Sequence, residues 1–159
     1  MSLDKRAVLT AFQKSIRADL DAAVASQKQA HEDATHEEAR PENDKDTRAT
    51  ESSYLARGLA RRVADLQFAS NAFKTLPFKD LKAVALGALL SIEDEDESVA
   101  HYFVGPAAGG HAIEHEGVSI KVITPESPLG KAVLGKSPDD EVSFRSPKGV
   151  RELYIASVS

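Results

Sequence analysis

Two long stretches free of proline, joined through Pro41, dominate the first 76 residues of this 159-residue chain. The first stretch, residues 3–38, also lacks glycine, and its apolar and small residues recur at steps of three and four, which is the spacing of one helix face. Because proline disfavours helical backbone at the residue before it, this helix is predicted to end near residue 39. A second helix is predicted over residues 48–76, ending before Pro77.

The inner faces of the two predicted helices mirror each other about a point near residue 43. This symmetry predicts an antiparallel helical hairpin as a domain over residues 1–76. Between Val24 and Tyr54 the chain has no Val, Ile, Leu, Met, Phe, Tyr or Trp, so this part is predicted to pack on alanines and to bury little apolar area. Gly58 fits close approach of the two backbones or is a tolerated surface glycine. The mirrored pairs are Phe12 with Phe73, Ile16 with Ala69, Leu20 with Leu66, Ala23 with Val63, and Ala30 with Ala56.

The net charge of the chain, −5, is concentrated around the turn of this hairpin. Residues 32–51 contain eight acidic and three basic side chains, whereas the other 139 residues contain 17 of each sign. The repulsion within such a window is relieved by solvent, a metal ion or a basic partner. The window is therefore either a solvated loop or a tip that presents carboxylates to a ligand.

Residues 77–159 change to the short, alternating apolar runs of β-strands. One short helix is predicted among them, because Ser127 and Pro128 suit the N-cap and the first helical position and Gly135 suits the position after its end. The pattern predicts a second domain, a small antiparallel sheet with one helix, so the whole chain is expected to be α+β. The predicted strands cover residues 88–92, 99–104, 119–123, 141–145 and 151–158, with a further short segment between Gly110 and Gly117.

Composition and motifs exclude several other classes of protein. No uncharged apolar run approaches about 18 residues, so no membrane span is expected. The absence of cysteine excludes disulfides, thiol catalysis and Cys-ligated zinc, and the first residues lack the apolar segment of a signal peptide, so a cytoplasmic protein is expected. His111 and His115 share a strand face without a third ligand fixed by spacing, so no metal site is assigned there. No phosphate-binding loop, nucleophile elbow or H-E-x-x-H motif occurs, and stand-alone catalysis is not indicated.

Two segments and the order of the domains resemble the bacterial GreA/GreB family of transcript-cleavage factors. Ser127–Lys136, followed by Asp139–Val142, is similar to the family signature S-P-(I/L)-x-x-A-(L/I)-(L/I)-G-K-x-x-G-D-x-V. Tyr54–Leu66 is similar to the segment in which the family has a glycine and an arginine next to a hydrophobic residue. The resemblance covers almost the whole chain, and it implies a helical hairpin followed by an FKBP-like β-rich domain.

The resemblance also implies a function as an accessory factor of bacterial RNA polymerase. Gre-type proteins insert the hairpin into the secondary channel of the polymerase, and carboxylates at the tip help to hold a second Mg²⁺ at the polymerase's own active site, where backtracked RNA is hydrolysed. Mg²⁺ prefers hard oxygen ligands and keeps several waters, so one or two tip carboxylates complete a site supplied mainly by another protein. The implied partners are RNA polymerase and the 3′ end of the nascent RNA, with no membrane, and the chain is expected to be a monomer without enzymatic activity of its own.

The tip departs from the family pattern D-x-x-E-N-A-E-Y. Glu42 and Asn43 match the E-N pair, so Glu42 is carried over as a metal-presenting residue. The expected aspartate position holds Ala39, and Asp44 and Asp46 are assigned to the Mg²⁺ site in its place on proximity alone, although both also suit caps of the second helix. A Gre-like regulator that occupies the same channel without stimulating cleavage is therefore the alternative interpretation.

Basic residues supply the remaining candidate contacts. Arg57 and Arg61 lie one helical turn apart with Arg62 beside them, and they are either ordinary helix-surface charge or contacts to RNA phosphates or to acidic polymerase surface. In the signature helix and its exit, the resemblance places four residues against the polymerase: Ser127, Pro128, Lys131 and Lys136.

A third interpretation, from a different class of protein, is a peptidyl-prolyl isomerase, because the family's C-terminal domain resembles FKBP-type proteins. Such an enzyme needs an aromatic-lined pocket. The second half of the chain has no Trp, so this pocket is not expected. The aromatic residues considered for it are Phe78, Tyr102, Phe103, Phe144 and Tyr154.

Overall fold

The computed structural model of the chain describes residues 2–38 and 45–159. It forms two compact units. The hairpin unit is Lys14–Ser70, and the β-unit combines Met1–Gln13 with Asn71–Ser159. The first and last turns of the predicted hairpin domain thus belong to the β-unit. The elements are α1 (Lys5–Glu38), α2 (Lys45–Lys74), β1 (Leu89–Asp94), β2 (Val99–Val104), β3 (Ala112–His115), β4 (Val118–Ile123), α3 (Pro128–Val133), β5 (Glu141–Ser146) and β6 (Gly149–Val158).

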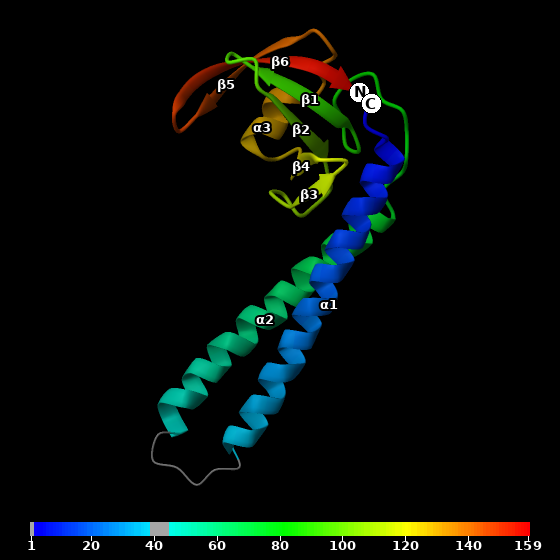
Figure 1. The fold of residues 1–159 in the computed structure, drawn as a ribbon. Helices are drawn as coiled ribbons and strands as arrows, with labels where there is room; N and C mark the ends of the chain where they lie inside the picture. Colours follow the sequence, from blue (N-terminus) through cyan, green and yellow to red (C-terminus); the bar gives the residue numbers. More distant parts are fainter. Residues whose placement is uncertain (1, 39–44) are drawn as a thin grey trace. The chain divides into compact units, whose positions relative to one another are not determined.

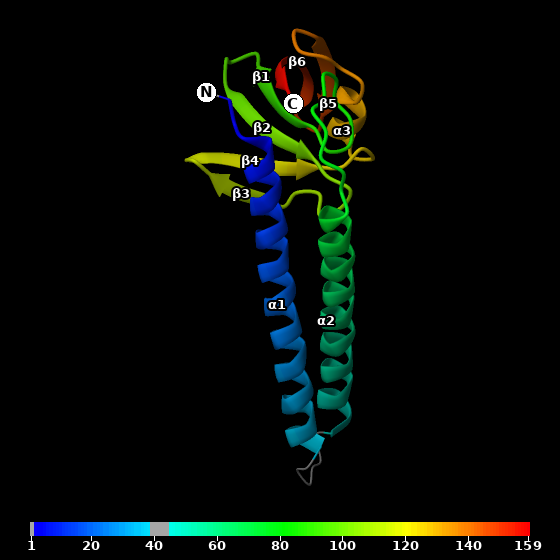
Figure 2. The ribbon, with the colours of Figure 1, turned by 90° about the vertical axis from the view of Figure 1, so that its right-hand side faces the viewer.

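Within the hairpin unit, α1 and α2 run antiparallel beside each other, as the mirrored pattern predicts (Figure 1, Figure 2). Leu20, Ala23 and Leu66 form a buried cluster with Val63 packed against it, which confirms two of the predicted pairs. α1 ends one residue before the predicted boundary, and α2 begins three residues earlier than predicted. The apolar spacing of the two helices therefore specified their pairing correctly.

The packing of the hairpin weakens toward its turn. No residue of segments 24–36 or 50–65 is buried, and Ala56, predicted to face Ala30, is exposed. A Cβ added at Gly58 meets no atom within 4 Å, and the residue is exposed. The interpretation of Gly58 as a close approach between backbones is therefore wrong, and it is a surface glycine in the middle of a helix.

The β-unit contains one six-stranded sheet in the order β3-β4-β2-β1-β6-β5. Four of its strand pairs are antiparallel, as predicted, but β2 and β4 run parallel, which the sequence did not predict. The cause is β3, which occupies the outer edge and pairs antiparallel with β4, so that β4 returns in the direction of β2. At the end of β2 only glycine fits, because a Cβ at Gly105 would lie 2.7 Å from the Phe73 ring.

Two apolar clusters stabilise the β-unit. Phe12, Phe73 and Phe103 are fully buried, with the Phe12 centroid 6.1 Å from that of Phe73 and 5.5 Å from that of Phe103. The distance between Phe12 and Phe73 confirms the predicted pair, and the distance between Phe12 and Phe103 adds a contact of α1 to β2. The other cluster lies between the sheet and α3 and includes Leu90, Val133 and Ile155. No helix in the described part of the chain has an apolar stretch long enough to cross a bilayer.

Candidate functional site

The helix of the signature segment, α3, is fixed at both ends by its own residues. The Ser127 hydroxyl accepts a hydrogen bond from the Gly130 amide at 3.1 Å and donates one to the Thr124 carbonyl at 2.7 Å. Pro128 begins the helix, and Gly135 after its end has a φ of +81°. A Cβ at Gly130 would overlap the Thr124 carbonyl oxygen, so this position requires glycine. The sequence-based prediction of a Ser-Pro start and a glycine end is confirmed.

Replacing Ser127 by alanine is expected to lower the free energy of unfolding by about 1 kcal/mol, because the Gly130 amide loses its cap. Urea unfolding followed by circular dichroism measures this change. Ser119→Ala, at an exposed position in β4, is the matched control. Equal stability of the two variants would show that the cap contributes nothing.

Of the other residues assigned to polymerase docking, Pro128 and Lys131 are exposed, whereas Lys136 is half-buried. The backbone of Lys136 is bound on both sides: its carbonyl accepts from the Val84 amide at 2.7 Å, and its amide donates to the Val133 carbonyl at 3.0 Å. This residue therefore anchors the segment before β1 to α3. A role in docking stays a prediction for all four residues.

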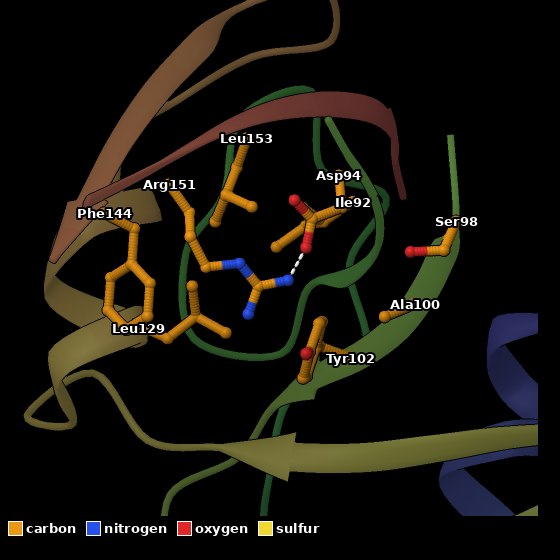
Figure 3. A pocket seen from close by; sticks show the side chains of 9 residues that line it. All are labelled: Ile92, Asp94, Ser98, Ala100, Tyr102, Leu129, Phe144, Arg151 and Leu153. Carbon is orange, nitrogen blue, oxygen red and sulfur yellow. Dashed lines mark ion pairs between the residues drawn. The ribbon is translucent and has the colours of Figure 1, made fainter. Parts of the chain in front are cut away.

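α3 borders a small pocket on the β-unit, shown in Figure 3, whose volume is about 130 Å³. An ion pair between Asp94 in β1 and Arg151 in β6 crosses it, and the Arg151 side chain reaches over the pocket toward Asp94 (Figure 3). Side chains from four strands and α3, together with Ser98 before β2, form the rest. The lining residues are Ile92, Asp94, Ser98, Ala100, Tyr102, Leu129, Phe144, Arg151 and Leu153.

The polar groups of this pocket are held in place. The Asp94 side chain is only 14% exposed; one of its oxygens pairs with Arg151, and the other accepts from the Glu95 amide at 2.7 Å. Burial raises the pKa of the Tyr102 phenol, so Tyr102 stays a neutral hydroxyl donor at physiological pH. Arg151, 49% exposed on its side chain, keeps part of its guanidinium available to solvent or to a partner.

The size of the pocket limits what it binds. Sites for small molecules and cofactors usually span about 300–1,000 Å³, so a pocket of about 130 Å³ is too small for them. It has the size and lining to accept one apolar side chain from a partner protein, next to a charged pair that offers both a donor and an acceptor. The sequence did not reveal this pocket, because Asp94 and Arg151 meet only through the register of β1 with β6. Of the residues that line the pocket, only Leu129 belongs to the signature segment.

The aromatic residues considered for an isomerase pocket do not converge. Only Tyr102 and Phe144 line the pocket. Phe103 is buried in the core, and Phe78 packs under Lys5 and Arg6. The Tyr154 hydroxyl donates a hydrogen bond to Asp139, and this bond raises the pKa of the Tyr154 phenol.

The arginines of α2 lie on the surface of the hairpin unit. Arg57, Arg61 and Arg62 are all exposed, and none of them forms an ion pair with a residue whose side chain the structure describes. The Arg57 guanidinium lies 6.0 Å from the centre of the Tyr54 ring. These two side chains, with Thr50 and Ser53, border a shallow hollow of about 290 Å³.

The predicted Mg²⁺ ligands lie outside the part that the structure describes. Glu42 and Asp44 fall in segment 39–44, as does Ala39; the backbone of Asp46 belongs to α2, but its side chain is outside the described residues. Among the described side chains, no group of three or more His, Asp or Glu has the arrangement of a metal site. This holds also for His111, in the loop before β3, and His115, in β3. The assignment of Mg²⁺ to these three carboxylates stays a prediction.

Comparisons with known proteins identify relatives for most of the β-unit. Residues 79–159 match the family of the C-terminal domain of transcription elongation factors GreA/GreB. Transcription elongation factor GreA of Thermoanaerobacter pseudethanolicus is 34% identical over 101 residues, which cover 61% of this chain and 60% of that protein. Transcription elongation factor GreB of Vibrio vulnificus is 36% identical over 76 residues, or 47% of this chain and 44% of that protein. The solved structure of GreA factor homolog 1 (Gfh1) of Thermus thermophilus covers 92% of this chain and 94% of its own, at 17% identity and a TM-score of 0.38. The chain thus spans about 60% of the length of the first of these relatives.

Proposed function

The chain belongs to the GreA/GreB family of transcription elongation factors, and we therefore propose that it binds RNA polymerase, inserts its hairpin into the secondary channel and stimulates cleavage of backtracked RNA by the polymerase active site. The observation that carries this proposal is the pocket beside α3. It lies within the region that matches the family, and it is formed by a capped helix and by strands whose Asp94 and Arg151 side chains are paired with each other. Such a pocket is preorganised for a protein partner, because few groups must be ordered on binding.

The β-unit supplies docking in this proposal. An apolar side chain of the polymerase enters the pocket and contacts Leu129 and Phe144, while the polar edge formed by Asp94 and Arg151 orients it. The exposed Lys131 on α3 adds electrostatic attraction at the rim. In this proposal the exposed residues Pro128 and Lys131 of the signature helix act together with the pocket as one docking surface.

The hairpin unit supplies carboxylates in this proposal. Oxygens of Glu42, Asp44 and Asp46 are hard donors of the kind that Mg²⁺ accepts, so the residues present fit a shared Mg²⁺ site. In a two-metal reaction the two ions together would stabilise the attacking and the leaving oxygen, and Glu42, Asp44 and Asp46 would help to hold one of them. The role of this chain is to bring negatively charged ligands to that position, and the polymerase performs the hydrolysis.

The proposal is tested on a stalled, backtracked RNA polymerase complex whose transcript is labelled at the 3′ end. Addition of the purified protein with Mg²⁺ is expected to release short labelled 3′ fragments promptly. If the label stays in the full-length transcript at saturating protein, stimulation of cleavage is excluded.

A second candidate function is a Gre-like regulator that occupies the channel without stimulating cleavage. Ala39, at the position where the family pattern has an aspartate, favours it. This regulator releases no fragments, and it inhibits the cleavage stimulated by a separately added GreA factor. Inhibition without fragment release therefore distinguishes it from the leading proposal.

A further inference from the structure

A second hollow of the β-unit, with a volume of about 500 Å³, opens where β2 and β4 begin. The two strands pair only from His101 and Ile120 onward. Before that point β2 is paired with β1 and β4 with β3, so the beginnings of the two strands separate. We call this space the β2–β4 hollow. Its volume falls within the range of about 300–1,000 Å³ that is usual for small-molecule sites.

The polar side chains that line the β2–β4 hollow can all donate hydrogen bonds. They are His101 and Tyr102 from β2 and Ser119 and Lys121 from β4. Among the described residues, no Asp or Glu lines the hollow. Lys121 is exposed, and it forms no ion pair with a residue whose side chain the structure describes. Donors and a positive charge without carboxylates favour a ligand that carries a negative charge.

Apolar side chains form the other walls of the hollow. Val99, at the start of β2, is 51% exposed and lines the hollow, and Val118, at the start of β4, is half-buried there. Apolar walls with a few polar groups are typical of sites that bind small organic molecules. The lining therefore fits a ligand in which an apolar group carries the negative charge.

The His101 ring is held by a chain of hydrogen bonds that crosses three strands. The Ser157 hydroxyl of β6 donates to the Ser91 hydroxyl oxygen of β1 at 2.9 Å, and this oxygen lies 3.0 Å from Nδ1 of His101. Because Ser91 accepts from Ser157, its own proton is available to Nδ1. In a neutral imidazole whose Nδ1 accepts, the hydrogen is on Nε2. His101 thus keeps an Nε2–H donor for the hollow that its ring lines.

A β-bulge in β6 brings Ser157 into this chain. Residues 155 and 157 of a regular strand share one face. Here Ser91 is opposite Ser157 and Ile92 is opposite Ile155, so Ala156 is the extra residue. Ile155 is fully buried in the core, whereas Ser157 is exposed beside Ser91 on the other face. Bulges re-aim side chains next to functional sites, and this one is an indication, independent of the lining, that the orientation of His101 matters.

We propose that the β2–β4 hollow binds a small organic anion, in which a carboxylate or a phosphate is attached to an apolar group. The anionic oxygens accept hydrogen bonds from Nε2 of His101 and from the Lys121 ammonium. The apolar group packs on Val99 and Val118. This site goes beyond the proposed function, since it requires neither the tip of the hairpin nor RNA polymerase.

Two-dimensional NMR of the ¹⁵N-labelled full chain tests the proposal, with phenylacetate, phenyl phosphate and the uncharged phenylacetamide as probes. An anion of about ten non-hydrogen atoms is expected to bind with a Kd on the order of 1 mM. The tighter of the two anions identifies the acidic group. Phenylacetamide is expected to bind about 5–10-fold more weakly, because it lacks the charge. The amide shifts are expected to centre on Val118 and Ser119, and the ring ¹⁵N shifts of His101 to show the hydrogen on Nε2.

Three variants separate the roles of the lining residues. Lys121→Gln and His101→Phe are each expected to weaken anion binding about 5–10-fold. Ser91→Ala keeps the imidazole but removes the bond that fixes it, so a mixture of ring tautomers and a loss of about threefold in affinity are expected. Lys148→Gln, at an exposed lysine between β5 and β6 outside the hollow, is the control and is expected to bind like the wild type.

The same titrations give the results that would overturn the proposal. Equal binding of phenylacetamide and the two anions would exclude an anion site, as would wild-type affinity of the folded Lys121→Gln and His101→Phe variants. The hollow shares Ala100 and Tyr102 with the pocket beside α3, whereas Leu129 and Arg151 line only that pocket. Shift changes centred on Leu129 and Arg151 would therefore place the ligand in the pocket and contradict the proposal. Because polymerase is absent, either outcome leaves the cleavage assay unaffected.

Discussion

Stimulated transcript cleavage is expected to fall by about 10²–10³-fold when Glu42, Asp44 and Asp46 are replaced together by Gln, Asn and Asn. The amides keep the size of the side chains and, at the aspartates, their ability to cap a helix, but they remove the negative charges that Mg²⁺ requires. Affinity for RNA polymerase is expected to change by less than about threefold, because the proposal assigns docking to the β-unit. The cleavage rate at saturating protein and the Kd for core polymerase, measured on the same preparation, check both parts.

The control for this variant removes an equal number of charges elsewhere. Glu114, Glu116 and Glu126 are exposed on the β-unit, and their replacement by glutamine is expected to leave cleavage at the wild-type rate. If the tip variant and this control behave alike, net charge rather than the tip determines cleavage. Undiminished cleavage by the tip variant would refute the assignment of Mg²⁺ to these carboxylates.

Filling the pocket beside α3 is expected to have the second largest effect. Ala100 is exposed on β2 and lines the pocket, so Ala100→Phe places a ring in the space of about 130 Å³ without removing any core side chain. Affinity for polymerase is expected to fall at least about 30-fold, the loss typical of a central interface anchor. Cleavage is expected to recover as the protein concentration is raised, because the tip is intact.

Ala112→Phe is the matched control for the filled pocket. Ala112 is an exposed alanine in β3, outside the pocket, and the same substitution there is expected to leave the polymerase Kd unchanged. The melting temperatures of both variants show whether the sheet has remained folded. Equal affinity of the two variants for polymerase would exclude the pocket as the docking point.

The elements that the sequence predicted well are those specified by local or regularly repeated signals. The helical spacing on both sides of Pro41 predicted the pairing of Leu20 with Leu66, and the Ser127 cap and Gly135 predicted the bounds of α3 within one residue. β2 was predicted with its observed bounds because Val99–Val104 is an apolar run between an acidic turn and Gly105.

The features that the sequence did not predict depend on which strands become neighbours. The parallel pairing of β2 with β4 follows from the edge position of β3, and the ion pair of Asp94 with Arg151 follows from the register of β1 with β6. Neither has a local signature. At Gly58 the sequence left two alternatives open, because helical spacing alone does not distinguish a buried contact from an open surface.

A photo-cross-linking amino acid at position 43, between the predicted Mg²⁺ ligands, measures most directly where this chain acts. In a backtracked RNA polymerase complex with 3′-labelled RNA, the account predicts cross-links to the RNA 3′ end and to polymerase residues beside its catalytic Mg²⁺. The Ala100→Phe substitution is expected to abolish these cross-links at limiting protein. Cross-links confined to the outer surface of the polymerase would contradict the account, since the tip would then never reach the active site.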